Sequence, residues 1–238
     1  MQKERVLVTG ASGFIGSNLL DYLLEKDYEV IGLSRQKNLP KIHPHLTWIR
    51  ALEELKHDRI DYVVNLAGES IAQGRWTDAR KQKLIASRVE TTTMLYQYLA
   101  KRNIQPKCII SGSAVGYYGI DPTEQWTECC NEQSAPQSIF MSELCQKWEQ
   151  SARQDTSQNT KIIRLGVVFG RGAGILPQML FPIKMNLCGR IGSGRQPVVW
   201  VHIQDVLRAI EFLMLHETTE QVFNVVSPEK VTQSAFTQ

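Results

Sequence analysis

The feature that most constrains this chain lies near its N-terminus, where an apolar run leads into three regularly spaced glycines. Residues 6–8 are Val-Leu-Val, which favours a β-strand, and Gly10, Gly13 and Gly16 follow at intervals of three. Leucines at helical spacing come next, over residues 19–24. The sequence therefore predicts a strand, a tight turn and a helix in direct succession.

A helix that starts in such a turn is suited to binding a phosphate. The backbone N–H groups of its first turn lack partners within the helix and carry a partial positive charge. Gly10 permits the sharp turn, Gly13 leaves room for a pyrophosphate, and Gly16 lets the helix pack closely. A glycine-rich turn that binds nothing is the alternative. The residues expected to bind a dinucleotide here are Gly10, Ser12, Gly13, Phe14, Ile15 and Gly16.

The end of the second predicted strand, residues 29–33, indicates which dinucleotide would bind. NAD-binding units place an acidic residue about twenty positions after the glycines. Here Ser34 and Arg35 stand at that point. A hydroxyl followed by a guanidinium suits a 2′-phosphate, so the sequence favours NADP(H) over NAD(H). The alternative for Arg35 is a solvated surface cation.

A third apolar strand begins at Tyr62 and ends in small residues. In a doubly wound sheet, ligands lie outside the carboxyl ends of the strands. The residues that we therefore expect to border the cofactor are Leu66, Ala67, Gly68 and Glu69.

The long helix predicted over residues 78–101 carries Arg88 at the margin of its apolar stripe. A partly buried cation needs a counter-charge. Cofactor phosphate, Glu69 and another acidic side chain of the protein all stay open as the partner, and we include Arg88 among the candidate cofactor-binding residues.

The Thr-Gly-x-x-Gly-x-x-Gly pattern that starts at Thr9 resembles the extended, epimerase-like branch of the short-chain dehydrogenase/reductase (SDR) superfamily. Motifs similar to one atypical, NADP-binding subgroup, sometimes labelled cell-division inhibitor homologues, cover nearly the whole chain. They lie at residues 65–69, 75–76, 87–88, 113–119, 144–149, 164–172 and 192–205. The resemblance implies an α/β fold, a Rossmann-type doubly wound parallel sheet with a small C-terminal substrate lobe.

The same resemblance suggests how the chain divides into domains. We expect residues 1–165 to form the NADP-binding Rossmann domain, with residues 189–215 packing back on it. Residues 166–238 supply elements of the substrate lobe, which we expect to be truncated because the chain stops as a helix opens at residues 232–236. Two further helices are predicted, an apolar one over residues 175–187 and one from Val206 that Asp205 caps.

The resemblance also implies that Ser113 is the catalytic serine and that Val167 and Val168 lie beside the nicotinamide. The tyrosine and lysine of the family's Tyr-x-x-x-Lys motif are replaced by Phe140 and Leu144. Phenylalanine has no proton to give. Candidates for the missing proton donor are Tyr117, Tyr118, Glu69 and Cys145, of which we select Tyr117.

Composition excludes several other classes of protein. The net charge of +3 is too small to indicate nucleic-acid binding, and no apolar run approaches the roughly 18 residues of a membrane span. Five cysteines, without a C-x-x-C spacing or an export signal, predict reduced thiols and no metal site. We expect a cytoplasmic protein, monomeric or homodimeric, whose partner is a small-molecule substrate of unknown identity.

These features favour an NADP(H)-binding oxidoreductase or epimerase acting on a carbonyl compound or a nucleotide-sugar-like molecule. The alternative is a non-catalytic module that binds NADPH and senses the redox state of its pool. Phe140 together with Leu144 is the feature that keeps this alternative open.

Overall fold

The computed structural model describes residues 3–36, 39, 42–56, 59–72, 74–125, 129–171, 174 and 192–236. Seven strands form one sheet in the order β3-β2-β1-β4-β5-β6-β9, and every neighbouring pair is parallel. The strands are β1 (Arg5–Thr9), β2 (Glu29–Leu33), β3 (Leu46–Ile49), β4 (Tyr62–Asn65), β5 (Cys108–Ala114), β6 (Thr160–Leu165) and β9 (Val222–Val225). Two shorter strands, β7 (Val167–Phe169) and β8 (Trp200–His202), pair with each other in a separate sheet.

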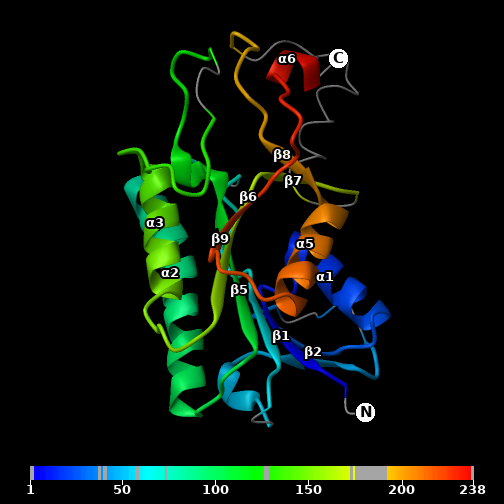
Figure 1. Ribbon diagram of the computed structural model, residues 1–238. Helices are drawn as coiled ribbons and strands as arrows, with labels where there is room; N and C mark the ends of the chain where they lie inside the picture. Colours follow the sequence, from blue (N-terminus) through cyan, green and yellow to red (C-terminus); the bar gives the residue numbers. More distant parts are fainter. Residues whose placement is uncertain are drawn as a thin grey trace.

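Helices cover both faces of the main sheet (Figure 1). On one face lie α1 (Phe14–Glu25) and α5 (Ile203–Leu215), and on the other lie α2 (Asp78–Lys101) and α3 (Phe140–Ala152). The short elements are η1 (Leu52–Glu54), η2 (Val115–Tyr118) and α6 (Gln233–Phe236). This architecture confirms the predicted doubly wound α/β sheet. None of the helices in the described residues is both long and apolar enough to cross a membrane.

The first strand shows why a continuous apolar run suits this sheet. Val6 and Val8 are fully buried in the core on the α1 and α5 side, whereas Leu7 is fully buried in the core on the α2 side. Successive side chains of a strand point to opposite faces, and here both faces are covered by helices. An unbroken apolar strand is therefore what a parallel sheet of this kind requires.

Some elements differ from those predicted. The sequence analysis missed β3, an edge strand of four residues that is only partly buried. The last long helix begins at Ile203, three residues earlier than predicted, and its N-cap is His202, whose Nδ1 accepts a hydrogen bond from the Gln204 amide over 3.3 Å. Asp205 lies in the first turn and pairs with Arg208, so the prediction that Asp205 caps the helix was wrong.

The segment predicted as substrate lobe contributes to the main sheet. β9 pairs with β6 at its edge, with Leu165 opposite Val225, and α5 packs against α1. β7 and β8 lie beyond the carboxyl end of β6, and α6 lies above them at the top of Figure 1. The domain boundaries themselves stay predictions, and the helix predicted at residues 175–187 lies outside the described residues.

The strand order places the candidate site. β1 has β2 on one side and β4 on the other, so the order of connection reverses at this point of the sheet. Ligands of open α/β sheets bind at such a switch point, outside the carboxyl ends of the strands. The glycine turn and the ends of β4 and β5 all lie at this edge.

Candidate functional site

Each glycine of the β1–α1 turn has a different steric environment. Gly10 has a φ of +65°, and a Cβ there would come within 2.6 Å of the Leu66 carbonyl oxygen. A Cβ on Gly16 would lie 2.2 Å from the Gly10 carbonyl oxygen, so this glycine lets the helix pack on the turn itself. A Cβ on Gly13 would meet only the Gly10 oxygen, at 3.2 Å, and otherwise faces open space. That open side is where a ligand has room to approach.

The start of α1 leaves backbone donors free. Gly13 is the N-cap, no side chain caps the helix, and the first turn has no acidic residue. Within the described residues, the amides of Phe14, Ile15 and Gly16 have no hydrogen-bond acceptor. Free amides at a helix N-terminus favour an anion, as the sequence predicted for this turn.

The predicted specificity residues lie beside this turn, at the ends of β1 and β2. Ser12 Oγ and Ser34 Oγ are 2.7 Å apart, so a hydrogen bond joins the two strand ends. Ser34 is buried, whereas Arg35 is exposed and forms no hydrogen bond or ion pair with another described residue. Arg35 thus directly follows a residue that is hydrogen-bonded to the β1–α1 turn.

The loop after β4 is anchored by a buried asparagine that the sequence analysis did not select. Asn65 is fully buried; its Oδ1 accepts a hydrogen bond from Thr9 Oγ1 over 2.6 Å, and its Nδ2 donates to Thr92 Oγ1 over 2.8 Å. Thr9 Oγ1 in turn accepts from the Ala67 amide over 3.2 Å. These bonds hold Leu66, Ala67 and Gly68 against the glycine turn. A polar residue at the end of an apolar strand was the available signal.

Arg88 is buried without an acidic partner among the described residues. Its Nη1 donates to the Leu84 carbonyl over 3.1 Å and its Nη2 to the Glu69 carbonyl over 3.0 Å. Burial lowers the pKa of Arg88. The Arg88 guanidinium lies directly against the loop that carries Gly68: a Cβ on Gly68 would be 3.0 Å from Arg88 Cζ.

The carboxylate of Glu69 is committed elsewhere. It pairs with Lys83 over 2.9 Å and with Arg80. Hydrogen bonds from these two side chains lower the pKa of Glu69, and the bond from Lys83 has the larger effect. The Glu69 carboxylate forms no ion pair with Arg88 among the described residues: its charge raises the pKa of Arg88 through space, while the Glu69 backbone carbonyl accepts the hydrogen bond from Arg88. Its ionised, paired state also makes it a poor proton donor.

The serine at the end of β5 belongs to a buried charge network. Ser113 Oγ donates to Glu149 Oε1 over 2.7 Å, and both residues are buried. Arg164 donates from Nε to Glu149 Oε1 over 2.8 Å and from Nη2 to Oε2 over 2.9 Å. Glu149 and Arg164 lie in the motifs at residues 144–149 and 164–172, but no role was predicted for either residue. A charged residue inside the apolar strand at 160–165 was the missed signal.

The two tyrosines of η2 lie against the same arginine. The Arg164 Cζ atom is 3.5 Å from the centroid of the Tyr117 ring. Tyr118 Oη accepts from Arg164 Nη1 over 2.9 Å and donates to Asn224 Oδ1 over 2.7 Å. Burial raises the pKa of Tyr118, which makes it a weaker acid. No described residue hydrogen-bonds the hydroxyl of Tyr117, so this phenol remains available to a ligand.

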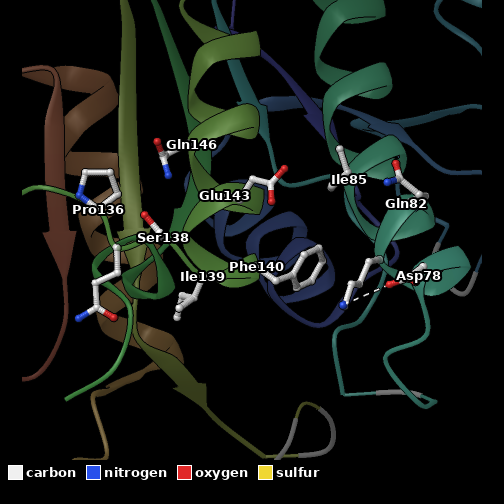
Figure 2. Close-up of a pocket in the computed structure, with 11 residues that line it drawn as sticks. Asp78, Gln82, Ile85, Pro136, Ser138, Ile139, Phe140, Glu143 and Gln146 are labelled. Carbon is white, nitrogen blue, oxygen red and sulfur yellow. Dashed lines mark hydrogen bonds and ion pairs between the residues drawn. The ribbon is translucent and has the colours of Figure 1, made fainter. Parts of the chain in front are cut away.

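The positions of the missing tyrosine and lysine are apolar and packed. Phe140 lines a cleft of about 540 Å³ between α2 and α3, with its ring directed toward α2 (Figure 2). The ring packs edge to face on Trp76, with centroids 5.6 Å apart, and the Lys81 Nζ lies 5.6 Å from its centre. Leu144 is buried, and burial raises the pKa of the neighbouring Cys145 to about 11, so its thiol is not a base near neutral pH.

The remaining predicted residues lie in β7, directly after β6. Val167 is partly exposed and pairs with Trp200, and Val168 packs against the core on the α1 and α5 side. Their placement beside a nicotinamide stays a prediction. Among the described residues, no cluster of histidine, cysteine or acidic side chains could hold a metal ion.

The sequence of residues 6–226 matches the NAD dependent epimerase/dehydratase family. The chain belongs to this family. An epimerase family protein of Staphylococcus saprophyticus is 35% identical over 238 residues, which cover 98% of this chain and 78% of that protein. A similar protein of Staphylococcus epidermidis is 33% identical over the same length.

Solved structures show the same fold. The human epimerase family protein SDR39U1 (isoform 2), determined with NADPH, has a TM-score of 0.85 and 34% identity, covering 98% of this chain and 77% of that one. A nucleoside-diphosphate sugar epimerase of Corynebacterium glutamicum has a TM-score of 0.80 and 26% identity, covering 99% of this chain and 49% of that one. These likenesses confirm that the chain is an atypical extended SDR protein of the epimerase type.

Proposed function

We propose that this chain binds NADP(H) at the carboxyl edge of the sheet and transfers hydride to or from a small molecule held beside Ser113. The observation that carries the proposal is the β1–α1 turn. Its free amides at Phe14, Ile15 and Gly16 face a side of the turn where Gly13 leaves open space. The family is NAD dependent by description, which agrees with a dinucleotide at this turn.

The preference for NADP(H) rests on Arg35. Arg35 follows Ser34 in the chain and is exposed, with no hydrogen bond or ion pair to another described residue, and a guanidinium suits a 2′-phosphate. The similar human protein was determined with NADPH. Titration of the protein with NADPH and with NADH, followed by fluorescence, tests the preference. Tighter binding of NADH would overturn it.

The substrate we propose is a carbonyl compound or a nucleotide-sugar-like molecule, in keeping with the sugar epimerase among the similar structures. Tyr117 is the phenol left to exchange a proton, since Tyr118 is hydrogen-bonded to Arg164 and Asn224. NADPH consumption against a panel of carbonyl compounds and nucleotide sugars tests turnover. We expect activity that survives Phe140→Ala and is lost in Ser113→Ala and Tyr117→Phe.

A second candidate is a non-catalytic NADPH sensor. The observation that favours it is the closed network around Ser113, together with the apolar packing of Phe140 and Leu144. Dinucleotide binding without any consumption, combined with a partner protein whose binding depends on the oxidation state of the cofactor, would select this candidate. A cytoplasmic location and a monomeric or homodimeric state are part of both proposals.

A further inference from the structure

The hydroxyl of Ser113 has its only proton committed. A serine hydroxyl supplies one donor and two acceptor lone pairs. In this structure the donor goes to Glu149 Oε1, 2.7 Å away, from a side chain that is 3% exposed. The hydroxyl also interacts with the Cys145 thiol, and a ligand at the end of β5 would meet it through an acceptor lone pair.

The partner of Ser113 is held as an acceptor. An ionised carboxylate accepts hydrogen bonds and donates none. Arg164 contacts both oxygens of Glu149, and the two side chains are 3% and 4% exposed. Both oxygens of Glu149 therefore act as acceptors in this arrangement, and Ser113 is the donor of the hydrogen bond between the two residues.

Arg164 is in turn fixed from several sides. Its Nη1 donates to Tyr118 Oη over 2.9 Å and to the Glu132 carbonyl over 3.1 Å, and its plane lies against the Tyr117 ring. The Glu132 carboxylate accepts from the Asn224 amide over 2.8 Å, which ties the same loop to β9. Contacts from η2, β6, β9 and the loop at Glu132 thus prevent the ion pair from turning away from Ser113.

We propose that Glu149 is a positioning residue that fixes Ser113 as a hydrogen-bond acceptor. The group recognised by Ser113 is then a donor, an alcohol O–H or an N–H, and a carbonyl oxygen is disfavoured there. This inference rests on the proposed function, because it takes Ser113 to face the substrate. It concerns recognition of the substrate before any hydride moves, and it narrows the substrate class to molecules that present a hydroxyl or amine at this point.

A matched pair of probes tests the inference. The affinities of cyclohexanol and cyclohexanone are measured by NMR titration, with and without a redox-inactive tetrahydro analogue of NADPH. One hydrogen bond of ordinary strength predicts about fivefold tighter binding of the alcohol by the unaltered protein. Glu149→Ala removes the acceptor of the serine proton, which leaves this proton free for a ligand, so the preference should vanish or reverse.

Two further variants keep the result interpretable. Glu143→Gln alters an exposed glutamate of the same helix, paired with Lys147, and should leave the preference unchanged. Ser113→Ala should abolish the preference even if Glu149→Ala fails to fold. Equal affinities, tighter binding of the ketone, no binding of either probe, or a preference that persists in Ser113→Ala would each overturn the inference. Failure of the dinucleotide analogue to bind in the same samples would instead overturn the proposed function.

Discussion

The two halves of the candidate site are built in opposite ways. The glycine turn is made of backbone: its donors are amides, and its specificity for glycine comes from collisions that a Cβ would cause. The edge at Ser113 is made of side chains: Ser113, Glu149, Arg164 and Tyr118 are hydrogen-bonded to one another there, whereas the Tyr117 hydroxyl has no partner among the described residues. The first is the open half of the site, and the second, whose side-chain donors are mostly committed within the protein, is the closed half.

This difference allows dinucleotide binding and turnover to be tested separately. The free amides and the steric fit of the turn suit a phosphate, whatever the side chains at Ser113 do. Phe140 and Leu144 stand where the resemblance places a tyrosine and a lysine, and α3 and the sheet form with these apolar residues in place. Five substitutions or titrations would break or sharpen the contrast.

The largest effect is expected at the closed network. Replacing Glu149 with alanine leaves Arg164 buried without its counter-charge, and we expect a loss of about 3–5 kcal/mol in the free energy of unfolding. Urea denaturation measures it. Glu143→Ala, which removes an exposed pair with Lys147 on the same helix, should cost less than about 0.5 kcal/mol. Equal costs for the two variants would mean that the network is not what stabilises this edge.

A methyl group in the glycine turn comes next. Gly10→Ala places a Cβ 2.6 Å from the Leu66 carbonyl oxygen at a φ of +65°, so we expect a loss of about 2–3 kcal/mol and no measurable NADPH binding. Gly74→Ala is the matched control, because Gly74 has a φ of +79° but open space around it. If both variants lose the same stability and both bind NADPH, the turn is not the binding element.

Alkaline pH should weaken the closed half through Cys145. Burial raises the pKa of this thiol from about 9.0 to about 11, so the unfolded chain loses the proton at a lower pH than the folded protein does. The stability that the protonated Cys145 thiol contributes to the folded protein is complete below about pH 9 and is lost as the pH rises toward about 11. We expect the free energy of unfolding to fall by roughly 2 kcal/mol more in the unaltered protein than in Cys145→Ala. Parallel curves for the two proteins would contradict this.

A smaller effect is expected for the cation beside the turn. Arg35→Ala should weaken NADPH binding about tenfold, roughly 1.4 kcal/mol, and leave NADH binding unchanged, because only NADPH carries a 2′-phosphate. Arg208→Ala, which removes an exposed cation of α5, controls for net charge and should change neither affinity. An equal loss of affinity for NADPH and NADH would show that Arg35 does not contact the 2′-phosphate.

The smallest effect is expected at Phe140. A hydroxyl added in Phe140→Tyr enters the cleft between α2 and α3, where polar side chains and Lys81 already lie. We expect a stability change within about 0.5 kcal/mol and a rate of NADPH consumption within about twofold, because Leu144 supplies no cation to lower the pKa of the phenol. A large gain in the rate of NADPH consumption would mean that the absence of a phenol at residue 140 alone limits activity.

The sequence predicted the elements whose signals are local and strong. The helix over residues 78–101 has the bounds predicted from its periodicity, and the apolar strands pair in parallel as expected. The strand at Leu46–Ile49 escaped because four residues at a sheet edge, only partly buried, carry little pattern. The cap at His202 escaped because histidine is not among the preferred capping residues.

At the candidate site, the sequence predicted the glycine turn but not the network of Ser113, Glu149 and Arg164. Gly10, Gly13 and Gly16 lie within one turn, so their spacing alone indicates the geometry. Ser113, Glu149 and Arg164 are separated by 36 and 15 positions along the chain, and nothing local says that they meet. Their contact depends on how α3 packs on β5 and on the pairing of β5 with β6.

The amino-acid sequence by itself determined where this chain turns and what its sheet buries, because steric collisions at a Cβ and the alternation of a strand act between near neighbours. Tertiary structure alone decided which way the Ser113 proton points and that Arg88 meets carbonyls instead of a carboxylate. Those outcomes depend on distances between segments far apart in the chain, and electrostatic partners are chosen only once packing has removed water from around them.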